Sequence, residues 1–84
     1  MSIKTLNNLI PGETAIVDQF TAELPLQSRL VEMGILPGVE LRLVKKAPFN
    51  GPLEFKIRGY HILLRWKDAG QILVRDRAGS KNGI

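Results

Sequence analysis

Residues 29–38, with the sequence RLVEMGILPG, decide the fold of this chain. They predict a helix that ends at a glycine, then a tight turn, then a strand. Gly34 is expected at the C′ position of the helix, because a left-handed backbone costs glycine nothing. Leu30 and Ile35 would then form the apolar pair of a Schellman motif, and Pro37-Gly38 would occupy the centre of a type II turn. The segment is specified as structure and holds no acid-base or nucleophilic constellation, which argues against an enzyme.

Apolar residues on either side of this segment change from a helical to a strand period. Upstream, Leu26, Leu30 and Met33 recur at i, i+4 and i+7 and predict the buried stripe of a helix. Downstream, apolar and charged residues alternate over residues 39–44 and again over 53–58. This alternation predicts two half-buried strands.

Shorter signals place the remaining elements. Apolar residues of both parities in the segment 13–20 predict a first strand with a bulge or with burial on both faces. Pro25 is expected as the first helical residue, where its missing N–H loses nothing. The other expected elements are a helical turn at 5–9, a hairpin loop at 47–52, a tight reversal at Gly59-Tyr60, a strand at 61–66 with Ile62, Leu64 and Trp66 on one face, a helical turn at 67–70 and a last strand at 72–75.

Short strands with one inserted helix predict an all-β domain shaped as a small five-stranded barrel. Closing the sheet removes edges that so short a chain could not otherwise cover. Strand periodicity alone would also fit an OB-like barrel. We expect the barrel domain to span residues 1–76, and residues 77–84, which lack periodicity, to form a flexible tail.

The composition is that of an ordinary small globular protein. The chain has 84 residues, 44% of them hydrophobic, and a formal charge of +4 with an isoelectric point near 9.9. It has no cysteine, so disulfides, thiolate catalysis and zinc–thiolate sites are excluded. No apolar run approaches the roughly 18 residues of a membrane span, and the N-terminus lacks the apolar segment of a signal peptide. We therefore expect a cytoplasmic protein.

Several motifs outside the segment 29–38 agree with one known family. They are Leu9-Ile10-Pro11-Gly12-Glu13, Lys46-Ala47-Pro48, Gly51-Pro52-Leu53, Arg58-Gly59-Tyr60, Leu64-Arg65, Asp68-Ala69 and Ile72-Leu73-Val74. Together with RLVEMGILPG they resemble, in order and spacing over about residues 5–75, the ferrous iron transport protein A (FeoA) family. Two small departures are Trp66, where lysine is commoner, and Gly70. The resemblance implies an SH3-like barrel whose helix is inserted between the first two strands.

The resemblance to FeoA also implies a role and a partner. The protein would be a small accessory of bacterial ferrous iron uptake, and its partner would be the membrane transporter FeoB. The cytosolic GTP-binding domain of FeoB offers a docking surface. Contact with it would recruit the protein to the inner face of the plasma membrane.

Metal ligands are scarce in the sequence. His61 is the single histidine, and no carboxylate pair lies near it. Hard carboxylates with one imidazole could hold a divalent ion only weakly, and nothing in the chain has ligand spacing. We interpret His61 as a strand-surface residue and expect no specific iron site and no cofactor.

Arg29 has two interpretations. Its stem could pack on apolar surface while the guanidinium bonds a carbonyl or a carboxylate, such as that of Glu32. Alternatively, it could act as an arginine finger, offered to a GTPase partner to stabilise charge on the transferred phosphate. Its position beside the helical stripe favours the structural interpretation.

Four apolar residues are better candidates for partner binding. Phe49 lies at the tip of a loop bounded by prolines, and Leu36 lies in the turn after the helix. Leu63 and Leu73 have the parity opposite to the core of their strands. Together they could form a binding patch. Alternatively, the helix or the N-terminal turn covers Leu63 and Leu73.

Three functions remain as hypotheses. The first is a non-enzymatic interaction module that modulates or assembles FeoB. The second is a basic barrel that binds nucleic acid, motivated by Lys45, Lys46, Lys56, Arg58, Arg65 and Lys67. The third is a regulatory domain, because the pattern also resembles the C-terminal domain of iron-dependent repressors, although no DNA-binding helices are attached. Alternation of basic with acidic residues, as in Glu40/Arg42 and Glu54/Lys56, favours a solvated surface over nucleic-acid binding.

Overall fold

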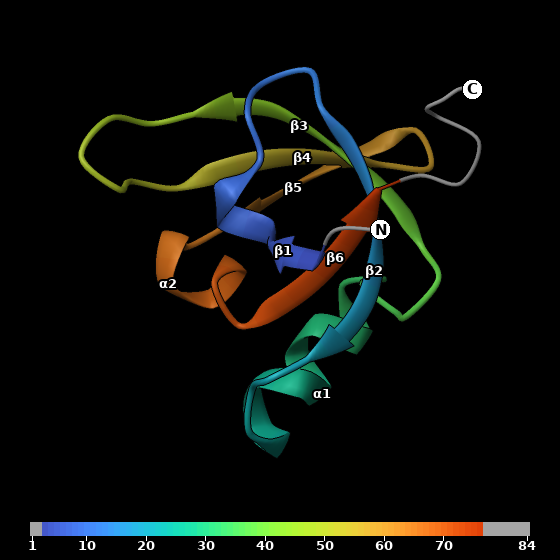
Figure 1. Ribbon diagram of the computed structural model, residues 1–84. Helices are drawn as coiled ribbons and strands as arrows, with labels where there is room; N and C mark the ends of the chain where they lie inside the picture. The colour runs from blue at the N-terminus through green and yellow to red at the C-terminus, as the bar shows by residue number, and fades with distance from the viewer. Residues whose placement is uncertain (1–2, 77–84) are drawn as a thin grey trace.

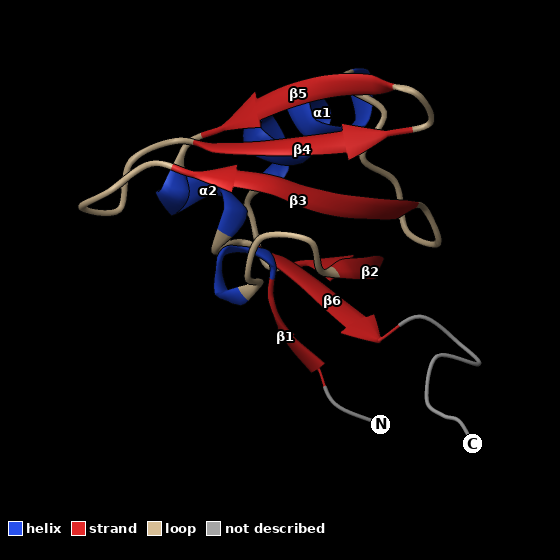
Figure 2. Ribbon diagram, turned by 90° about the horizontal axis from the view of Figure 1, so that it is seen from above, coloured by secondary structure: helices blue, strands red, loops and turns tan. Residues whose placement is uncertain are grey.

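A curved antiparallel sheet of six strands, in the order β1-β6-β2-β3-β4-β5, forms the body of the protein (Figure 1). The computed structural model describes residues 3–76, so the expected tail at 77–84 lies outside the described residues. The elements are β1 (Ile3–Thr5), the 3-10 helix η1 (Leu6–Asn8), β2 (Thr14–Phe20), α1 (Leu24–Glu32), β3 (Glu40–Lys46), β4 (Leu53–Ile57), β5 (Tyr60–Leu64), α2 (Trp66–Ala69) and β6 (Ile72–Asp76). Figure 2 shows β3, β4 and β5 side by side, with α1 behind them.

The end of α1 forms the Schellman motif that the sequence predicts. Gly34 follows the helix with a φ of +93°. The N–H of Ile35 donates to the carbonyl of Leu30 at 2.9 Å, and the N–H of Gly34 donates to the carbonyl of Val31 at 2.9 Å. Leu30 and Ile35 are both fully buried. The predicted helix end is confirmed.

A type II turn follows, as predicted, and joins the segment to the sheet. The N–H of Val39 donates to the carbonyl of Leu36 at 3.0 Å across Pro37-Gly38, and Gly38 has a φ of +92°. The N–H of Gly38 also donates to the carbonyl of Val17 at 2.8 Å, and the N–H of Val17 donates to Val39 at 2.9 Å. The path from α1 into β3 is therefore bonded to β2.

A bulge in β2 explains its mixed parity. The pairing of β2 with β6 shifts register between Val17 and Gln19, which leaves Asp18 as the extra residue. Val17 is buried before the shift, and Phe20 packs against the core after it. The predicted bulge is confirmed.

The N-terminal segment differs from the prediction. The helical turn predicted at 5–9 is present as η1, but it is preceded by the short strand β1, which the sequence does not predict. β1 pairs with β6, and Thr5 lies opposite Leu73. A strand of three residues is too short to show a period of two, so the five predicted strands are six in the structure.

The prediction of a closed barrel is also wrong. β1 and β5 are the two edges of the sheet, and no ladder joins them within residues 3–76. α1 instead lies beside β5, where the hydroxyl of Tyr60 donates to the carbonyl of Met33 at 2.9 Å. The prediction was that pairing with another strand would remove this edge; instead, α1 lies beside it. The predicted all-β architecture, with a helix inserted between β2 and β3, is otherwise found.

Several local boundaries differ by one or two residues from the prediction. α1 begins at Leu24, so Pro25 is its second residue, although its missing N–H still belongs to the unpaired first turn. The tight reversal is Arg58-Gly59, and Tyr60 already belongs to β5. Trp66 begins α2 and does not end a strand.

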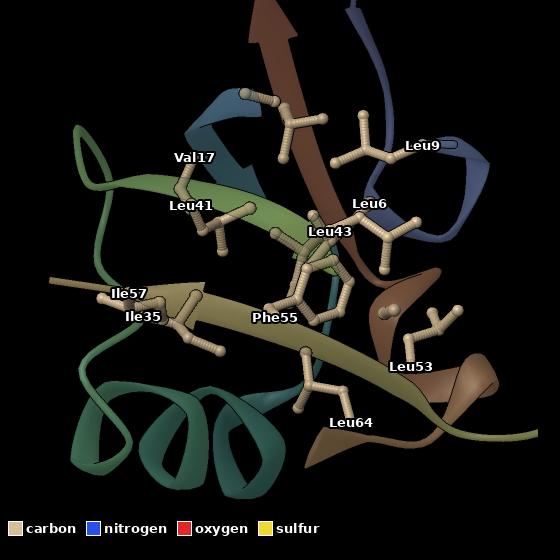
Figure 3. Packing of buried hydrophobic residues seen from close by; sticks show 14 of the residues in the cluster. Leu6, Leu9, Val17, Ile35, Leu41, Leu43, Leu53, Phe55, Ile57 and Leu64 are labelled. Atoms are coloured by element: carbon tan, nitrogen blue, oxygen red, sulfur yellow. The ribbon is translucent and has the colours of Figure 1, made fainter. Parts of the chain in front are cut away.

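The hydrophobic core fills the concave side of the sheet (Figure 3). Phe55 of β4 is the largest of its fully buried side chains. Leu30 of α1 is fully buried in the core, and Leu26 and Met33 pack against it, which confirms the predicted stripe. The predicted inward face of β5 also contributes Ile62 and Leu64, followed by Trp66 of α2.

Candidate partner-binding surface

The β3–β4 hairpin carries an aromatic ring in solvent at its tip. Phe49 is 99% exposed, and its loop projects from the body of the molecule (Figure 1). Phe49 and Asn50 have φ angles of +59° and +56°, and the N–H of Gly51 donates to the carbonyl of Pro48 at 3.1 Å. This pattern is a type I′ turn, whose central positions normally hold glycine, asparagine or aspartate. A bulky residue there is strained, and such strain is typical of functional sites.

An apolar groove of about 370 Å³, here called the hairpin groove, lies at the base of this loop. It is lined by Lys45, Lys46, Ala47, Pro48, Pro52, Glu54 and Leu63. Leu63, on edge strand β5, is 65% exposed. The alternative that α1 or the N-terminal turn buries Leu63 is therefore wrong.

A second groove of about 250 Å³, here called the helix groove, runs between α1 and β5. Its lining includes Leu26, Arg29, Met33, Leu63, Arg65 and Asp68. Leu63 belongs to both grooves, so the structure brings Arg29 and Leu63 together and connects them to the base of the Phe49 hairpin. Three of the five predicted site residues therefore lie on or beside one continuous surface.

Arg29 reaches from α1 to α2. Its Nη2 atom lies 3.5 Å from Oδ2 of Asp68, and 65% of its side chain is exposed. The guanidinium therefore contacts a carboxylate, as the structural interpretation expects, although the carboxylate is that of Asp68 and not Glu32. A pair this long and exposed holds the guanidinium only weakly, so Arg29 stays accessible at the rim of the helix groove.

Leu36 and Leu73 lie outside both grooves. Leu36 is 43% exposed in the turn after α1. Leu73 is half-buried on β6, where it lies opposite Thr5 of β1 and Gln19 of β2. The structure therefore separates these two residues from the other predicted site residues.

His61 pairs with a carboxylate on the neighbouring strand. Its Nδ1 atom lies 2.5 Å from Oε2 of Glu54, and both side chains are part-exposed on the outer face of the sheet. Among residues 3–76, no three or more histidine, cysteine, aspartate or glutamate side chains gather into a group that could hold a metal ion. The arrangement at His61 is an ion-pair or hydrogen-bond contact across two strands.

Two features of this surface escape the sequence analysis. Tyr60 bonds the C-terminal end of α1, and its hydroxyl lies against Gly34. Nothing in the sequence marks this contact, because the two residues come from separate elements. Pro48 and Gly51 in the sequence indicate a tight turn around Phe49. The positive φ angle that strains Phe49 is seen only in the structure.

Comparison with known proteins identifies the family of this chain. A family model for the FeoA domain matches residues 4–76. The chain belongs to the FeoA family. A solved structure of iron(II) transport protein A from Clostridium thermocellum is 35% identical, with a TM-score of 0.82, and the match covers 89% of this chain and 46% of that one. The predicted family and SH3-like fold are confirmed.

Two further proteins are similar to this FeoA-family chain, one in sequence and one in fold. It is 30% identical over 69 residues, 82% of its length, to an Fe(2+) transport protein A/Fe(2+) transporter FeoB fusion protein of Porphyromonas gingivalis (strain ATCC BAA-308 / W83). The chain spans only 8% of the length of that relative. A manganese-dependent transcriptional repressor in complex with manganese has a TM-score of 0.84 at 21% identity, over 92% of this chain and 38% of the repressor. That likeness shows a shared fold alone.

Within residues 3–76, neither helix is long and apolar enough to cross a membrane.

Proposed function

We propose that this FeoA-family chain is a non-enzymatic, cytoplasmic accessory of ferrous iron uptake that binds the membrane transporter FeoB. Binding would bias the nucleotide-driven conformations of FeoB or help to assemble it. The observation that carries the proposal is the fusion relative, in which a matching FeoA segment and the FeoB transporter share one polypeptide.

The fusion supports a physical association for a simple reason. Covalent linkage raises the effective concentration of one module near another, often into the millimolar range, without adding any contact. A separate chain with the same domain needs a binding surface of its own to reach the same partner. An exposed apolar patch with an accessible arginine would supply such a surface.

The grooves on either side of Leu63 are the best candidates for this surface. Phe49 would be the apolar anchor, because its ring is fully solvated in the free protein and its burial would be gained only in the complex. Leu63 would continue the apolar contact across both grooves. Arg29 would add a polar contact at the rim, and Leu36 and Leu73 would lie at or beyond the margin of the interface.

The test is binding of the purified protein to full-length FeoB from the same organism in neutral detergent, with and without a GTP analogue. We expect Phe49→Ala to weaken binding by about tenfold or more. Ile10→Ala is the matched control, because Ile10 is also an exposed apolar residue in a turn, at 65% exposure, but lies outside both grooves. It should bind as the unmodified chain does.

A second variant, Phe49→Asn, separates the ring from its backbone strain. Asparagine tolerates a positive φ, so this variant should be at least as stable as the unmodified chain and still lose affinity. Unchanged affinity of both Phe49 variants would remove the hairpin tip from the interface. Absence of binding in every nucleotide state would overturn FeoB as the partner.

A further inference from the structure

The positive charge of this protein is concentrated on the β3–β4 hairpin. Residues 40–58 hold five basic and two acidic side chains, a net charge of +3. The rest of residues 3–76 holds five basic and six acidic side chains, a net charge of −1. The net charge of the hairpin, +3, therefore exceeds the net charge of residues 3–76 as a whole, which is +2. Such asymmetry indicates an anionic partner.

Three of the five basic residues outside this hairpin in the described chain have a carboxylate partner. Lys4 pairs with Glu13 at 2.7 Å, Arg29 with Asp68 at 3.5 Å, and Arg75 with Asp18 at 3.5 Å. No ion pair between residues 3–76 involves the hairpin residues Arg42, Lys56 or Arg58. The sheet thus has one face where cations remain available to an external anion.

Pairing register brings two of these cations into direct opposition. Arg42 of β3 lies opposite Lys56 of β4, and the same row continues to Thr14 of β2 and His61 of β5. Like charges directly opposite each other destabilise an antiparallel pair. This opposition is a local cost to the sheet that a bound anion would reduce.

Arg58 extends the row into the β4–β5 turn. It has a φ of +48° next to Gly59 in a two-residue turn, where asparagine or glycine would be unstrained. Arg58, Arg42 and Lys56 surround an open groove of about 330 Å³, together with Thr14 and Gly59; Glu40 is the carboxylate in its lining. Strain at a cationic residue beside a basic groove is a second indication of a function for this end of the hairpin.

We propose that this groove, here called the basic groove, binds the phosphate groups of anionic phospholipids and so orients the domain on a membrane surface. Arg and Lys side chains near such a surface each add to the attraction without any deep pocket, which suits a shallow groove. No aromatic ring lines the groove, whereas proteins that bind single-stranded nucleic acid usually stack bases on several rings. One step rests on the proposed function, because docking on a membrane transporter places the domain beside a bilayer.

The experiment measures co-sedimentation of the full chain with vesicles of phosphatidylcholine and with vesicles of phosphatidylcholine mixed with phosphatidylglycerol. We expect binding only to the anionic vesicles, and loss of binding at high salt as exposed charges are screened. The variant Arg42→Gln/Lys56→Gln should bind about tenfold or more weakly, since each charge contributes roughly a factor of five. Binding that is equal on both vesicle types would overturn the proposal.

The matched control is Arg65→Gln/Lys67→Gln, which removes the same charge from exposed positions outside the hairpin. It should bind within about threefold of the unmodified chain if position, and not net charge alone, decides the attraction. Equal losses in the two variants would overturn a specific groove. Thermal melts of both variants should match that of the unmodified chain, because all four residues are exposed.

Two competition arms identify the source of the phosphate. Inorganic phosphate at millimolar concentration should displace little protein beyond its effect on ionic strength. Saturable displacement by phosphate would indicate a small-anion site and overturn the membrane assignment, as would tighter binding to a single-stranded RNA homopolymer than to anionic vesicles. Because vesicles contain no FeoB and the FeoB assay contains no anionic lipid, each proposal can fail without the other.

Discussion

At the scale of single residues, Tyr60 and Gly34 make the contact that holds the end of α1 against the edge of the sheet. The hydroxyl of Tyr60 donates to the carbonyl of Met33 at 2.9 Å. It also fills the space beside Gly34, where an added Cβ would lie 2.2 Å from that oxygen. Gly34 is therefore required twice, once by its φ of +93° and once by this close approach.

We expect Gly34→Ala to destabilise the fold more than Gly38→Ala. Both glycines have nearly the same φ, +93° and +92°, so each substitution carries a backbone cost of about 1–3 kcal/mol. Only Gly34 has a neighbour in the way, because no atom lies within 4 Å of a Cβ added at Gly38. Urea unfolding of the two variants measures the difference in the free energy of unfolding.

The double variant Gly34→Ala/Tyr60→Phe tests the cause of that difference. Removing the hydroxyl should relieve the clash, and Tyr60→Phe alone should cost about 1 kcal/mol for the lost hydrogen bond. Strictly additive effects of the two substitutions would show that the hydroxyl is not what excludes a side chain at Gly34.

At the scale of elements, α1 depends on a narrow apolar stripe. Only Leu30 among its residues is fully buried, while Leu24 and Val31 are 73% and 44% exposed. No side chain caps its N-terminus, since Glu23 makes no capping hydrogen bond. Packing of Leu30 and the Schellman motif behind it must therefore hold the helix in place.

We expect Leu30→Ala to lower the free energy of unfolding by about 2–5 kcal/mol, through lost burial and a cavity beneath the helix. Val31→Ala is the control on the same helix, because its side chain is partly in solvent. It should cost well under half as much. Similar losses in chemical denaturation would mean that α1 contributes little to the core.

At the scale of the whole molecule, an ion pair ties the first strand to the loop before β2. Nζ of Lys4 lies 2.7 Å from Oε2 of Glu13, and the N–H of Ile10 donates to Oε1 of Glu13 at 3.0 Å. The bond to Lys4 chiefly, helped by the Ile10 N–H, lowers the pKa of Glu13 below its usual 4.5, although partial burial opposes the shift.

The pKa of Glu13 predicts a loss of stability in acid. A carboxylate whose folded pKa is depressed contributes stability that is complete above its unfolded pKa and is lost as the pH falls through the folded one. We expect the midpoint temperature of thermal unfolding to decrease as the pH falls below about 4.5. The variant Glu13→Gln should show a smaller decrease over the same pH range than the unmodified chain. Parallel pH profiles for the two proteins would contradict this assignment.

Local signals in the sequence were enough to predict the structure of the segment 29–38 and the positions of the long strands. The Schellman motif, the type II turn and the bulge in β2 depend on residues near one another along the chain, so glycine, proline and apolar spacing predict them. The strand β1 and the open edge at β5 depend on distant pairing. Neither has a local signal, because three residues carry no period and an edge is defined by what is absent from one side of a strand.

The candidate surface divides in the same way. From the sequence alone follow the family resemblance, the apolar character of Phe49 and Leu63, and the excess of basic residues. Only the tertiary structure shows that Leu63 joins two grooves, that Phe49 is strained, and that Arg42 lies opposite Lys56. Spacing along the chain determines which face of a strand a residue occupies. The register between paired strands, and the packing of helices and loops around them, decide which charges and rings become neighbours.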